Sequence, residues 1–317
     1  MGAPVLLGST PAHEPIGMSR EVSPLGEVEA PTADTLCNSS KQNKAVGTNR
    51  CYVDKSESTV VSLFFFIVTF LGSALIVHIL KIIGLEEIYE AYLVPYWLTV
   101  IYVFVKAEGR KFEEYGFSTS IKIPYAIFSA FLAFALIFLA LTLGTCLRIY
   151  KVSMVSNFHV ASLIMYFIII LISSLGEEAI FRGYLLFKLS ESLGIRASTL
   201  IVSLLFSLLH FSNPGYNVIS FIQLFLAGIL LSIMVVYGGS IVYPVLYHAF
   251  WNYTQVLLGF PVSGHEYDHS ILTLNYNVSN DIITGGEFGL EGSVLGIVAT
   301  LLGLIVTKKF LLNVQSK

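Results

Sequence analysis

The stretch Gly176-Glu177-Glu178-Ala179-Ile180-Phe181-Arg182-Gly183 decides how this chain folds. It places two adjacent carboxylates and a guanidinium near the middle of a long apolar run, from His159 to Leu189. A charge at the centre of a membrane-spanning helix costs roughly 2.5–3.5 kcal/mol on insertion scales. Such side chains persist in a bilayer when they pair, face a wet cavity or take part in chemistry. The stretch therefore marks a candidate functional site inside a helical bundle.

The composition around this stretch is that of a membrane protein. Hydrophobic residues make up 55% of the 317 residues and charged residues only 12%, about half the usual ~25% of soluble domains. The sequence predicts an all-α fold, a polytopic transmembrane helical bundle of about eight spans, because each apolar segment is close to bilayer length or somewhat short of it. The segments are Thr59–Leu80, Ile88–Val105, Ile123–Leu147, His159–Leu189, Ser198–Phe211, Val218–Tyr237, Ser240–Leu258 and Leu290–Phe310.

Residues 1–58 differ from the rest of the chain. They are rich in Ser, Thr, Pro, Gly, Glu and Lys and contain no long apolar run, so the sequence predicts a disordered N-terminal tail. The three cysteines (Cys37, Cys51 and Cys146) have neither paired nor metal-ligand spacing. The net charge of −3 gives no indication of nucleic acid as a partner.

The distribution of basic residues predicts the orientation. With the N-terminus inside, most of the 18 Lys and Arg residues fall on the inner side, and the outer side holds only Lys81, Arg148 and Lys151. The loop Gly259–Gly289 contains no Lys or Arg. By the positive-inside rule, both termini are expected to be cytoplasmic.

Three pairs of residues share a spacing that places each pair on one helix face. Glu178 and Arg182 are spaced i,i+4 and are expected to form an ion pair, which leaves Glu177 free about 100° around the helix. The other two pairs are Phe206 with His210 and His248 with Asn252.

The polar members of these pairs are expected at one depth. The turn between the fourth and fifth segments centres near residues 193–194, about 16 residues from both Glu177 and His210, so an antiparallel pair brings them to matching heights. His248 and Asn252 lie about 12–18 Å into a segment that starts from the same side. All four groups are therefore predicted to converge in one layer of the membrane.

In order and context, these motifs resemble the CPBP family, which comprises the type II CAAX prenyl endopeptidases and the bacteriocin-processing or immunity proteins. The resemblance covers about Val160 to Leu258 and rests on Glu-Glu-x-x-x-Arg, Phe-x-x-x-His and His-x-x-x-Asn. It implies an intramembrane endopeptidase, with residues 59–312 as the transmembrane protease domain, residues 159–258 as its motif core and the first 58 residues as a cytoplasmic tail.

The resemblance also implies roles for the motif residues. Glu177 would be the general base that activates a water, and His210 would orient that water. His248 and Asn252 would donate hydrogen bonds to the oxyanion. Glu178, Arg182 and Phe206 would have supporting roles. The resemblance implies no metal or other cofactor, and its implied partners are a peptide or lipidated protein substrate and membrane lipid.

Two other functions stay open at this point. One is a zinc-dependent membrane metalloprotease that uses Glu177, His210 and His248 as ligands, or the His-Glu-x-x-His sequence at residues 265–269. The other is a non-enzymatic immunity or scaffold protein with the same fold. The sequence predicts a multi-pass protein of the cell membrane in a prokaryote, or of the endoplasmic reticulum in a eukaryote.

Overall fold

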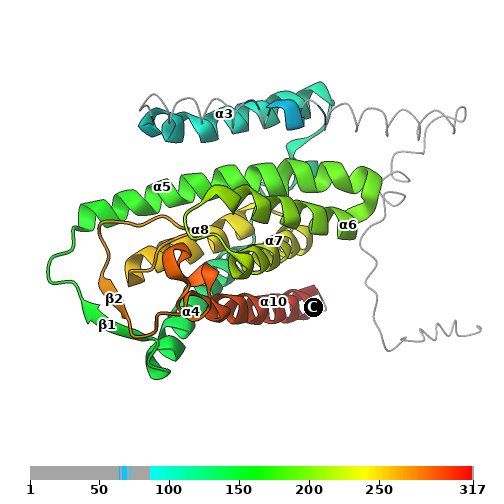
Figure 1. Cartoon of the computed structure of the whole chain (residues 1–317). Helices are drawn as coiled ribbons and strands as arrows, with labels where there is room; N and C mark the ends of the chain where they lie inside the picture. Colours follow the sequence, from blue (N-terminus) through cyan, green and yellow to red (C-terminus); the bar gives the residue numbers. More distant parts are fainter. Residues whose placement is uncertain (1–63, 65, 70–71, 73–85, 316–317) are drawn as a thin grey trace, which may run out of the picture. The chain divides into compact units, whose positions relative to one another are not determined.

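The computed structural model of the chain describes residues 64, 66–69, 72 and 86–315. The predicted tail and most of the first predicted span lie outside these residues. The fold is mostly helical (Figure 1). The elements are α3 (Glu86–Ala107), η1 (Phe112–Tyr115), α4 (Ile123–Cys146), β1 (Tyr150–Met154), α5 (Val160–Glu178), η2 (Ala179–Leu185), α6 (Leu186–Leu209), η3 (His210–Ser212), α7 (Val218–Gly238), α8 (Val242–Leu258), β2 (Leu272–Tyr276), α9 (Asp281–Thr284), η4 (Gly286–Phe288), η5 (Leu290–Gly292) and α10 (Val294–Gln315).

The predicted apolar segments from 88 onward all form helices. Four helical stretches among the described residues are long and apolar enough to cross a membrane: Ile123–Cys146, Val160–Ser212, Val218–Gly238 and Val294–Leu311. The apolar stretch Val94–Ala107 is shorter, and α8 has 17 residues. The protein is thus a multi-pass membrane protein, and Val160–Ser212 contains two of the predicted segments, the fourth and the fifth.

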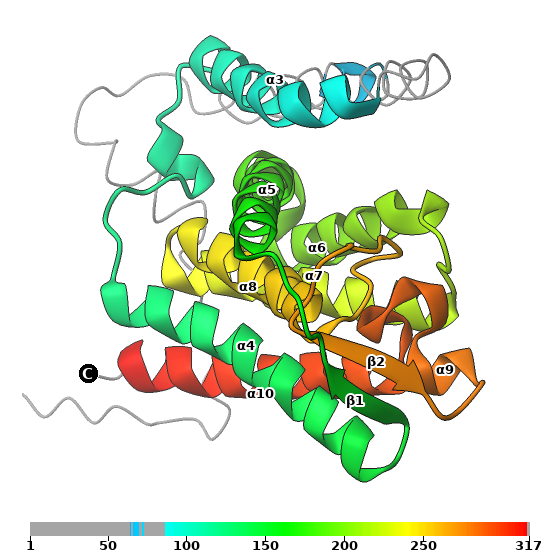
Figure 2. The same ribbon diagram turned by 90° about the vertical axis from the view of Figure 1, so that its left-hand side faces the viewer.

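One part of the fold departs from the all-helical prediction. β1 and β2 form a two-stranded antiparallel sheet in which Tyr150 pairs with Tyr276 and Met154 with Leu272. The sheet joins two loops that the sequence places on the outer side, and it covers one end of the helices (Figure 2). Two short strands separated by more than a hundred residues leave little local signal, because their pairing is decided by the helices that carry them.

The helices pack in layers, with the candidate motif helix α5 in the middle layer (Figure 2). α5 lies between α3 on one side and α8 on the other, and α6 packs on α7 (Figure 2). α8 in turn packs on α4 and α7, and α10 packs on both of these helices. α6 approaches α7 closely at Gly228, where a Cβ would lie 2.8 Å from Cα of Ser203. Small residues of this kind let membrane helices come close together.

The turn predicted near residues 193–194 is confirmed. Gly194 has φ +73° and ψ 159°, so it breaks the helical path inside the stretch labelled α6. Such a positive φ costs glycine little, whereas a side chain would be strained there. The chain reverses at this point, and α5 with η2 runs antiparallel to the second arm of α6.

Apolar side chains also cover the outside of the bundle. On α4 and α5 they recur every three or four residues on one exposed face, which is the pattern of a helix whose outer face contacts lipid. The exposed residues are Ile127, Phe131, Phe134 and Phe138 on α4, and Val160, Ile164, Ile168 and Ile172 on α5.

A buried charge network ties α3 to α6 at the end of the bundle where α3 ends. Nζ of Lys188 lies 3.2 Å from Glu108 and 3.3 Å from Glu191, and the lysine is only 2% exposed. The hydroxyls of Tyr115 and Tyr184 donate to Glu108 at 2.5 and 2.9 Å. Burial, together with the bond to Glu108, raises the pKa of Tyr115, so its phenol stays protonated and donates.

We expect Lys188→Met to destabilise the protein by about 3 kcal/mol, because it removes the buried ammonium that lies 3.2 Å from the carboxylate of Glu108. Thermal unfolding of the purified protein in detergent measures this change. Lys309→Met, which alters an exposed lysine on α10, is the control. Equal melting temperatures for the two variants would contradict a stabilising role for the network.

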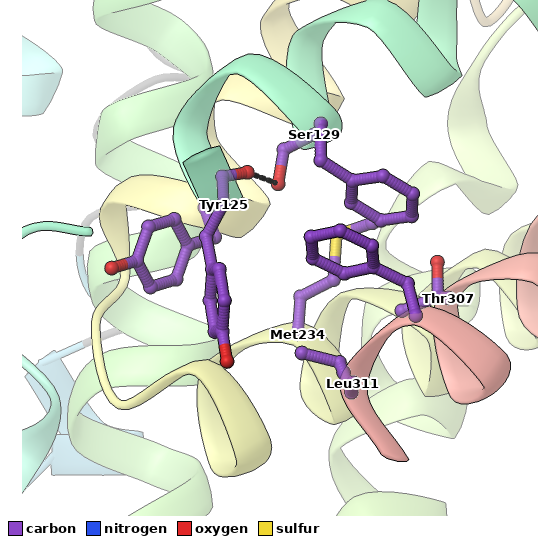
Figure 3. Close-up of a pocket in the computed structure, with 8 residues that line it drawn as sticks. Tyr125, Ser129, Met234, Thr307 and Leu311 are labelled. Atoms are coloured by element: carbon purple, nitrogen blue, oxygen red, sulfur yellow. Dashed lines mark hydrogen bonds between the residues drawn. The ribbon is translucent and has the colours of Figure 1, made fainter. Parts of the chain in front are cut away.

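A small pocket lies between α4, α7 and α10 at this same end (Figure 3). Its walls are mostly apolar, and Oγ of Ser129 donates to the carbonyl of Tyr125 at 2.9 Å. Phe128 and Phe310 stack across it with ring centroids 3.8 Å apart. None of the predicted site residues lines this pocket.

Candidate active site

The segment Gly176–Gly183 changes its helical form at the site. α5 ends at Glu178, and the next seven residues, Ala179–Leu185, form the π-helical turn η2. The glycines at the two ends allow neighbouring segments to come close. A Cβ at Gly176 would lie 2.8 Å from Val94 of α3, and one at Gly183 would lie 2.8 Å from the ring of Phe117. π-helical turns are rare and occur frequently at functional sites.

Glu178 binds two partners on different helices. Nη1 of Arg182 donates to its Oε1 at 3.0 Å, which confirms the ion pair predicted from the i,i+4 spacing. Nδ1 of His248 on α8 donates to the same oxygen at 3.0 Å. Glu178 and Arg182 are fully buried and His248 is 9% exposed. The carboxylate therefore joins α5 and η2 to α8, a contact that the sequence did not predict.

Phe206 on α6 lies at the centre of the supporting contacts. The guanidinium of Arg182 is 4.2 Å from the centroid of its ring, a favourable cation–π geometry. The rings of His210 and His248 are 5.0 and 6.0 Å from it. Phe206 is thus more than general core packing, because its ring contacts the arginine and both histidines.

His210 follows the last residue of α6 and is held by its own helix. Its Nδ1 lies 2.9 Å from the carbonyl oxygen of Phe206. A carbonyl only accepts, so Nδ1 carries the proton, and in the neutral ring Nε2 keeps a lone pair. His210 and His248 both line a small cavity between α6, α7, α8 and η5, which is partly open to solvent.

Glu177 and Asn252 are half-buried and contribute polar atoms that protein groups leave unsatisfied. Among the described residues, Oε2 of Glu177 and Oδ1 of Asn252 are shielded from solvent and have no hydrogen-bond partner. Buried polar atoms in native proteins are nearly always hydrogen-bonded. Oε2 of Glu178 and both Nε and Nη2 of Arg182 are in the same state, so these unsatisfied atoms indicate a place for water or for a polar group of a ligand.

The structure connects five of the seven predicted residues, whereas Glu177 and Asn252 are not among the residues that line the pocket of the two histidines. Glu178, Arg182, Phe206, His210 and His248 form a continuous set of contacts. In the described part of the chain, no hydrogen bond joins Glu177 to His210. Sequence reasoning also missed Glu291 and Trp251, which line the cavity beside the two histidines.

The arrangement offers no evident metal site. Among residues 64, 66–69, 72 and 86–315, no group of three or more His, Cys, Asp or Glu side chains could hold a metal ion. The His-Glu-x-x-His sequence at 265–269 lies in a turn and an irregular segment, so its two histidines do not share a helix face. The zinc-protease pattern requires such a helix.

Comparison with known proteins gives one family. No curated protein matches the chain. A family model described as "Type II CAAX prenyl endopeptidase Rce1-like" matches residues 159–254, close to the stretch whose motifs suggested the CPBP family. The match includes both glutamates, Arg182, both site histidines and Asn252. Residues 159–254 are therefore a domain of the type II CAAX prenyl endopeptidase (CPBP) family.

Proposed function

We propose that the protein is an intramembrane endopeptidase in which Glu177 activates a water molecule for attack on a peptide bond. The family implies CAAX endopeptidase activity of a membrane protein. The observation that carries the mechanism is the unsatisfied, shielded Oε2 of Glu177 beside the buried set of Glu178, Arg182 and His248. A carboxylate that is removed from water and left without a partner is available as a base.

In this mechanism Glu177 takes a proton from the water as the oxygen attacks the carbonyl carbon of the substrate. His210 supplies Nε2 as the acceptor that orients the water, since its Nδ1 is already bound to the carbonyl of Phe206. The proton then passes to the leaving amine, which leaves Glu177 ionised for the next cycle.

His248 and Asn252 would stabilise the negative charge that develops on the carbonyl oxygen. His248 donates through Nδ1 to Glu178, which leaves Nε2–H of the protonated ring as the donor for the oxyanion. A donor to the oxyanion is worth about 2.7–4 kcal/mol. Glu178 thereby acquires a role beyond its pair with Arg182, because it fixes the orientation and the protonation of His248.

The membrane arrangement completes the proposal. Eight spans with both termini cytoplasmic remain our proposal, with residues 59–312 as the protease domain and residues 1–58 as a tail. Arg110, Lys122 and Lys188 lie at the end where α3 finishes and α4 begins, and the opposite end carries few basic residues, which supports this orientation. The substrate is a membrane-associated peptide of CAAX type or a related lipidated peptide.

We expect His210→Ala to lower kcat by about 100-fold, the lower end of the range for general acid–base groups, with KM little changed. Purified protein reconstituted in liposomes is incubated with a quenched fluorescent CAAX-type peptide, and the products are identified by mass spectrometry. His159→Ala, at the exposed start of α5, is the control. Cleavage by the His210 variant at the control rate would reject the role assigned to this ring.

A further inference from the structure

Glu291 is a buried carboxylate in the wall of the cavity, and the proposed mechanism does not use it. It lies in η5 and is only 3% exposed. Its Oε1 accepts from Nε1 of Trp251 at 2.9 Å and from Nε2 of Gln255 at 3.3 Å. Its Oε2 accepts from the backbone N–H and the Oγ of Ser263, at 3.1 and 2.5 Å. These four neutral donors hold the carboxylate from two directions.

The number of bonds decides what Glu291 does. A carboxylate has about four lone-pair sites, and the four donors fill them. The side chain is therefore poorly suited to bind a substrate cation or to act as a second base. Its bonds instead join α8, through Trp251 and Gln255, to the turn at Ser263.

The turn at Ser263 also contacts the segment that carries His210. Nδ2 of Asn213, which follows η3, donates to the carbonyl of Ser263 at 2.8 Å. A Cβ at Gly264 would lie 2.3 Å from the carbonyl oxygen of Pro214, so the two loops touch directly. Ser263 has φ +47°, an uncommon conformation for a residue other than glycine. Both of its bonds to Glu291 favour this turn.

On the other side, the donors of α8 lie on the same face as His248. Trp251 follows His248 by three residues and Gln255 follows Trp251 by four, so all three share one helix face. His210, His248, Trp251, Ser263 and Glu291 line the same cavity. A continuous chain of contacts thus runs from the His210 segment through Ser263 and Glu291 to the helix of His248.

We propose that Glu291 is a positioning residue, which fixes the separation of His210 and His248 across the cavity through Ser263 and Trp251. This inference rests on the proposed function, because the separation matters if the two rings act on the same peptide bond. A misplacement of about 1 Å costs up to 10²-fold in rate. Loss of the contact should therefore lower kcat and leave KM nearly unchanged.

The test uses full-length protein and the same CAAX-type peptide. In Glu291→Gln the amide NH₂ replaces an acceptor and faces a donor of Ser263 or of α8, and we expect kcat to fall by about 10-fold. Ser263→Ala removes one of the four hydrogen bonds, and we expect a smaller fall in kcat. In the double variant, the effects of Ser263→Ala and Glu291→Gln on kcat should be less than additive. The control is Glu287→Gln, an exposed acid in the same loop.

The decisive comparison is made in the His210→Ala background. In that background, Glu291→Gln should still lower the melting temperature. It should leave the residual kcat unchanged, because the His210 ring, whose separation from His248 Glu291 is proposed to fix, is already absent. A further 10-fold fall in that background, a change confined to KM, or a kcat equal to that of Glu287→Gln would each overturn the proposal. If Glu291→Gln does not fold, Ser263→Ala is tested in the same way. Full activity of Glu177→Gln would instead show that the proposed function is wrong.

Discussion

Glu177→Gln is expected to abolish peptide hydrolysis, with kcat lower by about 10⁴-fold, the upper end of the range for a general base. Glutamine keeps the shape of the side chain but cannot take a proton from water at neutral pH. Because the glutamate is half-buried and its Oε2 has no partner among the described residues, its replacement breaks no observed hydrogen bond there. The folded protein should therefore persist and still bind peptide.

Two measurements separate loss of chemistry from loss of structure. The melting temperature of Glu177→Gln should match that of Glu266→Gln, a variant at an exposed loop residue. Affinity capture with the Glu177 variant should retain intact peptide that the wild-type protein cleaves. Wild-type rates in the Glu177 variant would contradict the proposed mechanism, and retention of no peptide would contradict the expected intact binding.

The second large effect is expected at Glu178, which is fully buried between Arg182 and His248. Glu178→Ala leaves a buried guanidinium without its carboxylate and should cost about 3–5 kcal/mol of folding free energy. Removal of both charges in Glu178→Met with Arg182→Leu should recover most of that stability, since apolar replacements of buried ion pairs are often neutral or stabilising. Thermal unfolding of the single and double variants measures both effects.

The same double variant tests the link to catalysis. Its stability should return, but its kcat should stay low because Nδ1 of His248 has lost its acceptor. Arg182→Leu alone keeps the contact between Glu178 and His248 and provides the matched comparison. A stable double variant with wild-type kcat would show that Glu178 serves only to pair with Arg182.

The local parts of this site could be predicted from the sequence. Helical spacing alone indicates the pair of Glu178 and Arg182. The boundary between the fourth and fifth apolar segments indicates the chain reversal near Gly194. Both depend on residues close together in the chain. The family motifs likewise fall within one continuous stretch, so their order is evident from the amino-acid sequence alone.

The contacts between distant segments could not be predicted in the same way. Glu178 and His248 lie 70 positions apart, and their contact depends on how α5 packs on α8. The prediction assigned Glu178 to one partner, but a carboxylate has acceptor sites for several donors. Glu291 escaped notice because it is the second residue of the predicted apolar segment Leu290–Phe310, and an acid at the end of a span has the pattern of a residue that faces water.

The π-helical turn at Ala179–Leu185 also sets the phase between two distant parts of the same helix. A turn that holds about one residue more than an α-helical turn rotates all that follows by roughly 100° relative to what precedes it. Glu178 before the turn faces His248, and Lys188 after it faces Glu108. Both contacts are made with this number of residues between them. The segment behaves as a spacer of fixed length. A change of its length by one residue would allow the contact of Glu178 with His248 or the contact of Lys188 with Glu108, but not both.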